Sequence, residues 1–193
     1  MTYETSLRSL TSACSAAGIV FHSRPVSALN DFIRSAFPAS LLLQIELVGY
    51  PGDCEIPWIV EDLYLYGFGD IESRQAGYRI DVRTRHIVEG WDANRYVIAD
   101  WSANPVVIGD DGRIAFAFHG MGSWKYQTIA DDLPSFFGLL AAWIRYFVIN
   151  HDGRLFDANS DLHEETIAEV IQITTDLKGV HQNEAVNFLL GMR

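Results

Sequence analysis

The stretch WSANPVVIGDDGRIAFAFHG, residues 101–120, decides the fold. Within it, two apolar runs typical of β-strands flank the Gly-Asp-Asp-Gly tetrapeptide at residues 109–112. Asp and Gly tolerate the positive φ angles that close a tight hairpin. A catalytic pair of carboxylates has to converge on one point, whereas the side chains of Asp110 and Asp111, as neighbours in a turn, diverge into solvent. The sequence therefore predicts a β-hairpin at this place and not an acid/base pair.

Other short strand candidates surround this hairpin. They are DLYLYGF (62–68), RYVIAD (95–100), a weaker WKYQTI (124–129), and YRIDVRTRHIV (78–88). The last alternates strictly, which predicts Arg79, Arg83 and Arg85 with Asp81 on one face of a strand. Residues 49–57 contain Gly and Pro and are predicted to form a loop. Strands joined by short turns predict a central, mostly antiparallel twisted sheet of about five to six strands.

Helical periodicity brackets this middle region on both sides. The predicted helices cover residues 3–17, 26–36, 39–47, 133–148 and 161–177, and a last short one contains Ala185, Phe188 and Leu189. Pro134 suits the first turn of the fourth helix, with Asp131 and Asp132 at its positive end. The fifth helix is predicted to bury Ile167, Val170, Ile171, Thr174 and Leu177. Helices, then a sheet, then helices indicate an α+β fold. With no linker in the sequence, we expect one domain over residues 1–193.

The bulk composition limits the classes of function. The formal net charge of the 193 residues is -11, which disfavours sequence-independent binding to nucleic acid and docking on anionic membranes. The longest apolar stretches are predicted to be too short to span a bilayer, and no signal peptide is apparent. Cys14 and Cys54 belong to no metal-binding motif, and Cys14 has the spacing of a buried small apolar residue. We expect a cytoplasmic protein with reduced thiols.

Motifs for catalysis or ligand binding are missing from the sequence. The six histidines form no HExxH pair, and GFGDIE and GMGSWK contain only G-x-G, without the spacing of a dinucleotide or phosphate loop. Asp157, Asn159 and Asp161 imitate the start of an EF-hand loop, but the turn glycine and the final glutamate are absent. We therefore expect no catalytic residue, no metal and no cofactor. The alternative is a hydrolase whose site gathers Asp100, Asp111 or His119 from separate turns.

Acidic doublets and tryptophans supply the candidates for an interface. Three tryptophans near strand ends are either lids on the core or aromatic anchors for a partner. The candidate interface residues are Glu61, Asp62, Trp91, Trp101, Asp110, Asp111 and Trp124. The arginines of 78–88 are read as a solvated strand face that resists edge pairing. Their alternative role is to pair with acidic doublets of this chain or of a second copy in a homodimer.

Three segments together carry a family resemblance. They are ALNDFIRSAFPASLLLQIELVGY (28–50), WDANRYVIADWSANPVVIGDDGRIAFAFHG (91–120) and YQTIADDLPSFFGLL (126–140). Their order resembles the SUKH superfamily, the Smi/Knr-type immunity and scaffold proteins, over about residues 27–140. The matching positions are Phe37-Pro38, Asp100, Asn104-Pro105, Asp111-Gly112 and residues 129–137.

The resemblance implies a protein that binds and does not catalyse. Members of the family commonly neutralise bacterial toxins, often nucleases or deaminases, and eukaryotic relatives resemble scaffolds in cell-wall signalling. The family implies no catalytic residues. An acidic surface would steer a basic toxin towards the protein and speed association. The expected function is therefore toxin neutralisation, and the alternative is a regulatory scaffold in cell-envelope or stress signalling.

Overall fold

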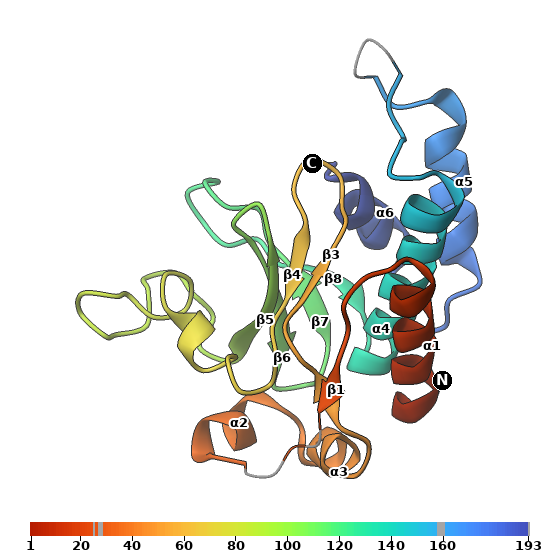
Figure 1. Ribbon diagram of the computed structural model, residues 1–193. Helices are drawn as coiled ribbons and strands as arrows, with labels where there is room; N and C mark the ends of the chain where they lie inside the picture. Colours follow the sequence, from red (N-terminus) through yellow and green to blue (C-terminus); the bar gives the residue numbers. More distant parts are fainter. Residues whose placement is uncertain (25, 27–28, 158–160, 193) are drawn as a thin grey trace.

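A six-stranded antiparallel sheet forms the centre of the computed structural model, which describes residues 1–24, 26, 29–157 and 161–192 (Figure 1). The strands follow one another in chain order: β3 (Cys54–Ile56), β4 (Leu63–Leu65), β5 (Arg95–Trp101), β6 (Asn104–Gly109), β7 (Ile114–Phe116) and β8 (Gln127–Ala130). Short strands β1 (Ser23–Arg24) and β2 (Tyr50–Pro51) pair separately. The sheet is open, and the predicted α+β class is confirmed.

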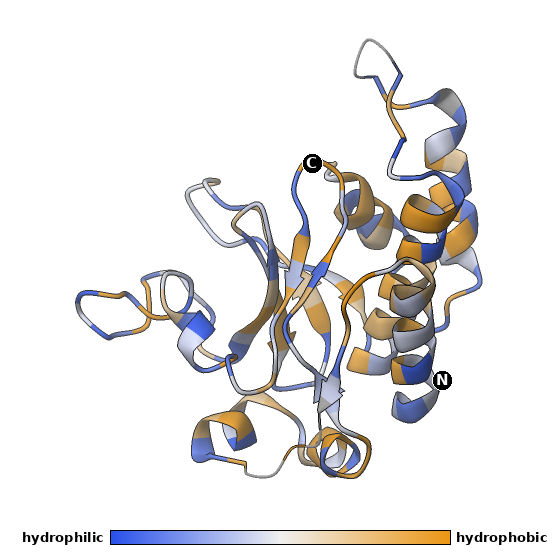
Figure 2. Cartoon of the chain, in the orientation of Figure 1, coloured by the Kyte–Doolittle hydropathy of each residue, from blue (hydrophilic) through white to orange (hydrophobic). Residues whose placement is uncertain are grey.

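Helices precede and follow the sheet, and the short helix η1 lies between β4 and β5. They are α1 (Tyr3–Ala16), α2 (Asp31–Ala36), α3 (Ala39–Val48), η1 (Ser73–Gln75), α4 (Leu133–Trp143), η2 (Ile144–Asn150), α5 (Glu164–Thr175) and α6 (Gln182–Leu190). Helix α1 lies along α4 on one side of the sheet, and α6 contacts β8 (Figure 1). Figure 2 shows hydrophobic residues along α4 and the central strands, where helix and sheet face each other. Their burial is the main source of stability.

The Gly-Asp-Asp-Gly segment forms the turn that the sequence predicts. Val106 pairs with Phe116 and Ile108 with Ile114, so β6 and β7 form a hairpin. Between them Gly112 has a φ of 82°, and the Asp111 carboxylate accepts a hydrogen bond of 3.0 Å from the Arg113 amide. The Asp111 carboxylate therefore holds the turn.

The helix that begins at Leu133 is longer than predicted. The Asp132 side chain caps this helix by accepting a 2.8 Å hydrogen bond from the Ser135 amide. Pro134 lies in the first turn of the helix, as expected. Because η2 continues α4, residues Leu133–Asn150 form 18 helical residues, long and apolar enough to cross a membrane by length and composition. The prediction that no stretch is long enough was therefore wrong. However, 67% of this helix is buried inside the fold, which accounts for its apolar composition.

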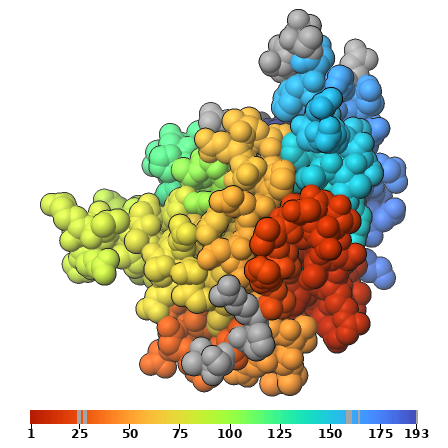
Figure 3. Space-filling model, viewed as in Figure 1, coloured from red at the N-terminus to blue at the C-terminus, as the bar shows by residue number. Residues whose placement is uncertain are grey.

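The predicted strand over residues 78–88 is wrong. The Asp81 carboxylate accepts hydrogen bonds from the amides of Arg83 (2.9 Å) and Thr84 (2.6 Å), and Ile80 bridges back to Ile87. An aspartate that captures nearby amides offers the chain a turn in place of a strand ladder. Residues 77–90, here called the arm, therefore reverse direction and project away from the sheet (Figures 1 and 3). The predicted row of arginines on a strand face does not exist.

Other boundaries also differ from the sequence prediction. The loop expected over 49–57 contains β2 and β3, and the helix expected from residue 26 begins at Asp31, where the Asn30 side chain caps it. Helix α5 leaves Ile167 and Ile171 exposed and buries Thr166, Val170 and Thr174. Threonines can be buried here because a hydroxyl such as that of Thr174 donates to a carbonyl one turn earlier. Of the residues compared with an EF-hand, Asn159 lies outside the described residues.

Candidate functional site

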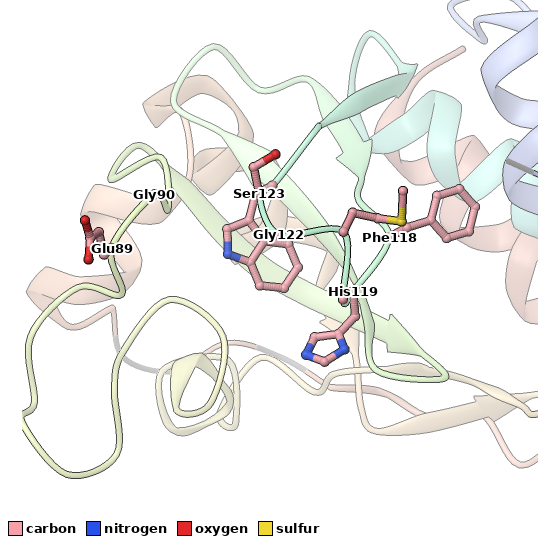
Figure 4. A pocket seen from close by; sticks show the side chains of 9 residues that line it. Glu89, Gly90, Phe118, His119, Gly122 and Ser123 are labelled. Atoms are coloured by element: carbon pink, nitrogen blue, oxygen red, sulfur yellow. The ribbon is translucent and has the colours of Figure 1, made fainter.

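An open pocket of about 490 Å³ lies between the loop that follows β7 and the base of the arm. The residues that line it are Glu89, Gly90, Phe118, His119, Gly120, Met121, Gly122, Ser123 and Trp124. Figure 4 shows two segments of the chain that line the pocket. One contains Glu89 and Gly90, and the other contains Phe118, His119, Gly122 and Ser123. Two segments far apart in the sequence therefore make one concave surface.

The loop over 118–124 is fastened where it leaves the sheet. The His119 amide donates a 2.8 Å hydrogen bond to Oδ1 of Asn104, the first residue of β6. Beyond it, Gly120 and Gly122 have φ angles of 78° and 73°, a conformation that glycine adopts readily. The backbone can therefore turn sharply twice within a few residues. As a result Met121 stands 51% exposed at the pocket.

Aromatic rings support the wall of the pocket from behind. The Trp124 ring contacts the Trp91 ring edge to face, with ring centroids 4.9 Å apart. The centroid of the His119 ring lies 6.0 Å from that of Trp124. Trp91 is buried, contacts Tyr126 edge to face, and donates its Nε1–H to the Arg95 carbonyl at 2.9 Å. Trp91 is thus fixed on the core, and it holds the half-buried Trp124 in one orientation.

Charge behind the wall is balanced locally. The guanidinium of Arg95 lies 4.6 Å from the centre of the Tyr126 ring and pairs with Asp92 at 3.1 Å. Burial raises the pKa of Tyr126 to about 12, so this phenol stays neutral at ordinary pH. In front of the wall, the exposed Glu89 contributes a carboxylate to the lining of the pocket.

The pocket combines few polar groups with apolar surface. It presents the indole of Trp124, the thioether of Met121, the imidazole of His119, the hydroxyl of Ser123 and the carboxylate of Glu89. Among the residues that the structure describes, no hydrogen bond joins the Ser123 hydroxyl to the His119 ring, the link that activates a serine nucleophile. The arrangement suits binding of a side chain with an apolar stem and a positive end, by ring contact and charge.

Of the seven predicted interface residues, the structure brings together Trp91 and Trp124, and the other five lie elsewhere. Trp124 lines the pocket, and Trp91 lies buried directly behind it. Trp101 is buried elsewhere, where its Nε1–H donates to the Ile59 carbonyl at 3.3 Å, so it acts as a lid on the core. The remaining four candidates are exposed in two turns: Glu61 and Asp62 before β4, and Asp110 and Asp111 between β6 and β7.

Of the three residues weighed for a hydrolase, Asp111 lies apart from His119. Asp100 accepts a 2.7 Å hydrogen bond from the Tyr78 hydroxyl and does not line the pocket that contains His119. Asp111 follows the end of β6 at Gly109, whereas His119 is fastened to its beginning at Asn104. Five residue steps of an extended strand separate these ends by about 17 Å. Asp111 and His119 therefore cannot act on one substrate atom together.

Sequence reasoning missed Glu89, Met121 and Ser123. The signal that could have found the loop is the pair of glycines in GMGSW, residues 120–124, between a strand and a tryptophan.

Among the described residues, no group of three or more His, Cys, Asp or Glu side chains is placed to hold a metal ion. No protein-family profile matches the chain, and neither a curated protein nor a solved structure matches it significantly. The site is therefore interpreted from its own chemistry.

Proposed function

We propose that this protein binds another protein through the pocket between the 118–124 loop and the arm, and that the partner is a basic bacterial toxin which it neutralises. The observation that carries this function is the fixed aromatic wall: Trp124 is open to the pocket while Trp91 holds it from behind at 4.9 Å. Aromatic side chains held in place before binding are typical of the few residues that dominate an interface, since little freedom is lost on association.

The charge of the pocket and of the chain favours a basic partner. Glu89 lies at the rim, and the chain carries a net charge of -11. A lysine or arginine of the toxin can lay its aliphatic stem against Met121 and its charge against Trp124 and Glu89. The overall negative field would increase the rate of encounter with a basic nuclease or deaminase. The resemblance of the segment order to SUKH immunity proteins supports the same function.

Co-expression with the toxin encoded beside this gene tests the proposal. We expect the wild-type chain to protect cells and to co-purify with the toxin. Trp124→Ala should weaken binding by roughly 30-fold, the effect of losing about 2 kcal/mol at a central aromatic contact. Leu47→Ala is the matched control, because it removes an apolar side chain that is 78% exposed on α3, away from the pocket.

The outcomes distinguish the function from the site. If the wild type neither protects nor binds the neighbouring toxin, toxin neutralisation is wrong. If Trp124→Ala binds as tightly as the wild type while Leu47→Ala does not, the protein binds toxins through α3 and not through the pocket. A circular dichroism melting curve for each variant separates loss of contact from loss of fold.

A further inference from the structure

We propose that a second pocket, formed by α2, η1 and the arm, binds a small molecule that carries a phosphate or a carboxylate on an apolar body. The pocket has a volume of about 350 Å³, within the range of small-molecule sites. Arg79 and Arg85 line it, and Phe32 and Ile80 contribute apolar surface. Among the described residues, none lines both this pocket and the one that contains Trp124, so this binding is independent of the proposed function.

The fold holds the guanidinium of Arg79 in one orientation. The centre of this group lies 4.5 Å from the centre of the Tyr96 ring, which belongs to β5. Its Nη2 donates a 3.0 Å hydrogen bond to the Ala93 carbonyl. A guanidinium that stacks on an aromatic ring keeps the N–H groups along its edge for an acceptor. Because the group is fixed before binding, little freedom is lost when an anion associates with it.

The positive charge at this pocket is not compensated by an ion pair. In the part of the chain that the structure describes, no carboxylate pairs with the guanidinium of Arg79 or of Arg85. The Nε of Arg79 is also buried and has no hydrogen-bond partner among those residues. Buried donors are nearly always paired, since an unpaired one costs stability. Carboxylate and phosphate oxygens are the acceptors that match an arginine best, because they accept two parallel N–H groups.

A turn of the arm brings the second arginine to the same pocket. The Asp81 amide donates to the His86 carbonyl at 2.9 Å, and the Arg85 amide donates to the Asp81 carbonyl at 2.9 Å. Within this turn Arg85 has a φ of 63°, in the left-handed region that side chains other than glycine rarely adopt. The chain therefore reverses, and Arg85 lines the pocket together with Arg79.

The charge balance of the lining favours an anion. Glu72 also lines the pocket, and its Oε2 accepts a 2.7 Å hydrogen bond from the Asn30 side-chain amide. Two arginines and one glutamate leave the lining positive, although the whole chain has a net charge of -11. At physiological ionic strength, charges more than about 8 Å away are largely screened, so the two arginines outweigh the distant carboxylates. The apolar surface of Phe32 and Ile80 favours a ligand with an apolar part.

Amide NMR spectra of the full-length protein, titrated with phenyl phosphate, benzoate and neutral benzyl alcohol, test the proposal. We expect saturable shifts of signals from residues 72–85 with at least one of the two anions, and none with benzyl alcohol. Saturation by phenyl phosphate alone identifies a phosphate ligand, and saturation by benzoate alone identifies a carboxylate. Signals of residues 118–124 should not move, because they belong to the other pocket.

Arg85→Gly removes one of the two guanidinium groups with little effect on the fold, because glycine readily adopts a φ of 63°. It should weaken anion binding by roughly 10-fold. Arg83→Gly is the matched control, since it removes an exposed arginine of the arm that does not line the pocket, and we expect a change of less than about twofold. The spectra of both variants report directly whether they fold.

Three results would overturn the proposal. The first is that neither anion gives saturable shifts at residues 72–85 of the wild type. The second is that benzyl alcohol binds as tightly as the anions, which would make the pocket an apolar site. The third is that Arg83→Gly weakens binding as much as Arg85→Gly, which would show a general effect of charge and not a site.

Discussion

The side-chain amide of Gln75 satisfies both backbone groups of Val97. Its Nε2 donates to the Val97 carbonyl at 2.9 Å, and its Oε1 accepts from the Val97 amide at 3.0 Å. Strand β4 pairs with β5 over Ala99–Trp101, so Gln75 continues the pairing of β5 beyond the end of β4. At 1% exposure, Gln75 connects η1, and the arm that follows it, to the sheet.

Replacing this amide should destabilise the fold. Gln75→Leu leaves the amide and the carbonyl of Val97 buried without a partner, and we expect a loss of about 2–4 kcal/mol in the free energy of unfolding. Urea denaturation followed by tryptophan fluorescence measures it. Gln44→Leu is the control, because Gln44 is exposed on α3 and its hydrogen bond to the Ser40 carbonyl is long, at 3.3 Å. Equal effects of the two substitutions would contradict the role given to Gln75.

The turn between β6 and β7 requires glycine at residue 112. A Cβ there would lie 3.2 Å from Cγ of Pro38, and the φ of 82° is unfavourable for alanine. Gly112→Ala should therefore cost about 1–3 kcal/mol of stability, from the strained φ and the crowding together. In contrast, Gly69→Ala meets nothing within 4 Å and should change stability by less than about 0.5 kcal/mol. Thermal melting of both variants checks the difference.

The turn between β5 and β6 stores strain that can be relieved. Ser102 and Ala103 have φ angles of 48° and 61°, the conformation of a type I′ turn, which favours Asn-Gly. We expect the double change Ser102→Asn and Ala103→Gly to raise the free energy of unfolding by about 1 kcal/mol. A differential scanning calorimetry trace that shows no rise, or a fall, would mean that the native side chains make compensating contacts.

Alkaline pH should destabilise the protein before its arginines titrate. Burial raises the pKa of Tyr126 to about 12, and burial also raises the pKa of Tyr3, Tyr66 and Tyr78. In the unfolded chain a tyrosine phenol titrates near pH 10. The stability that these buried, neutral phenols contribute is therefore complete below about pH 10, and it is lost as the pH rises towards their pKa values in the folded protein. Urea unfolding should therefore show a lower midpoint at about pH 11 than at about pH 8. An unchanged midpoint would contradict the burial of these phenols.

Local chemistry predicted much of the fold, and it failed where side chains act at short range on the backbone. Asp111 and Asp81 are both aspartates that accept from nearby amides. The first lies between two apolar runs, so the turn was predicted. The second interrupts a strict alternation of polarity, and periodicity alone does not report that a carboxylate captures the amides of residues 83 and 84.

The site was less predictable than the fold because it is made by long-range contacts. Trp124 and His119 were each candidates from the sequence, but nothing in the sequence places Glu89 opposite them. That placement depends on the direction of the arm, which follows from the Asp81 turn and from Gln75. Burial of Cys14, by contrast, was expected from its helical spacing, and the structure buries it.

Hydrogen–deuterium exchange on the complex with the neighbouring toxin tests the central claim most directly. The protein should show slowed exchange at the amides of residues 118–124 and 89–90 when the toxin is bound, and unchanged exchange on α3. Slowed exchange confined to α3 or α5, with residues 118–124 unaffected, would contradict binding through the pocket.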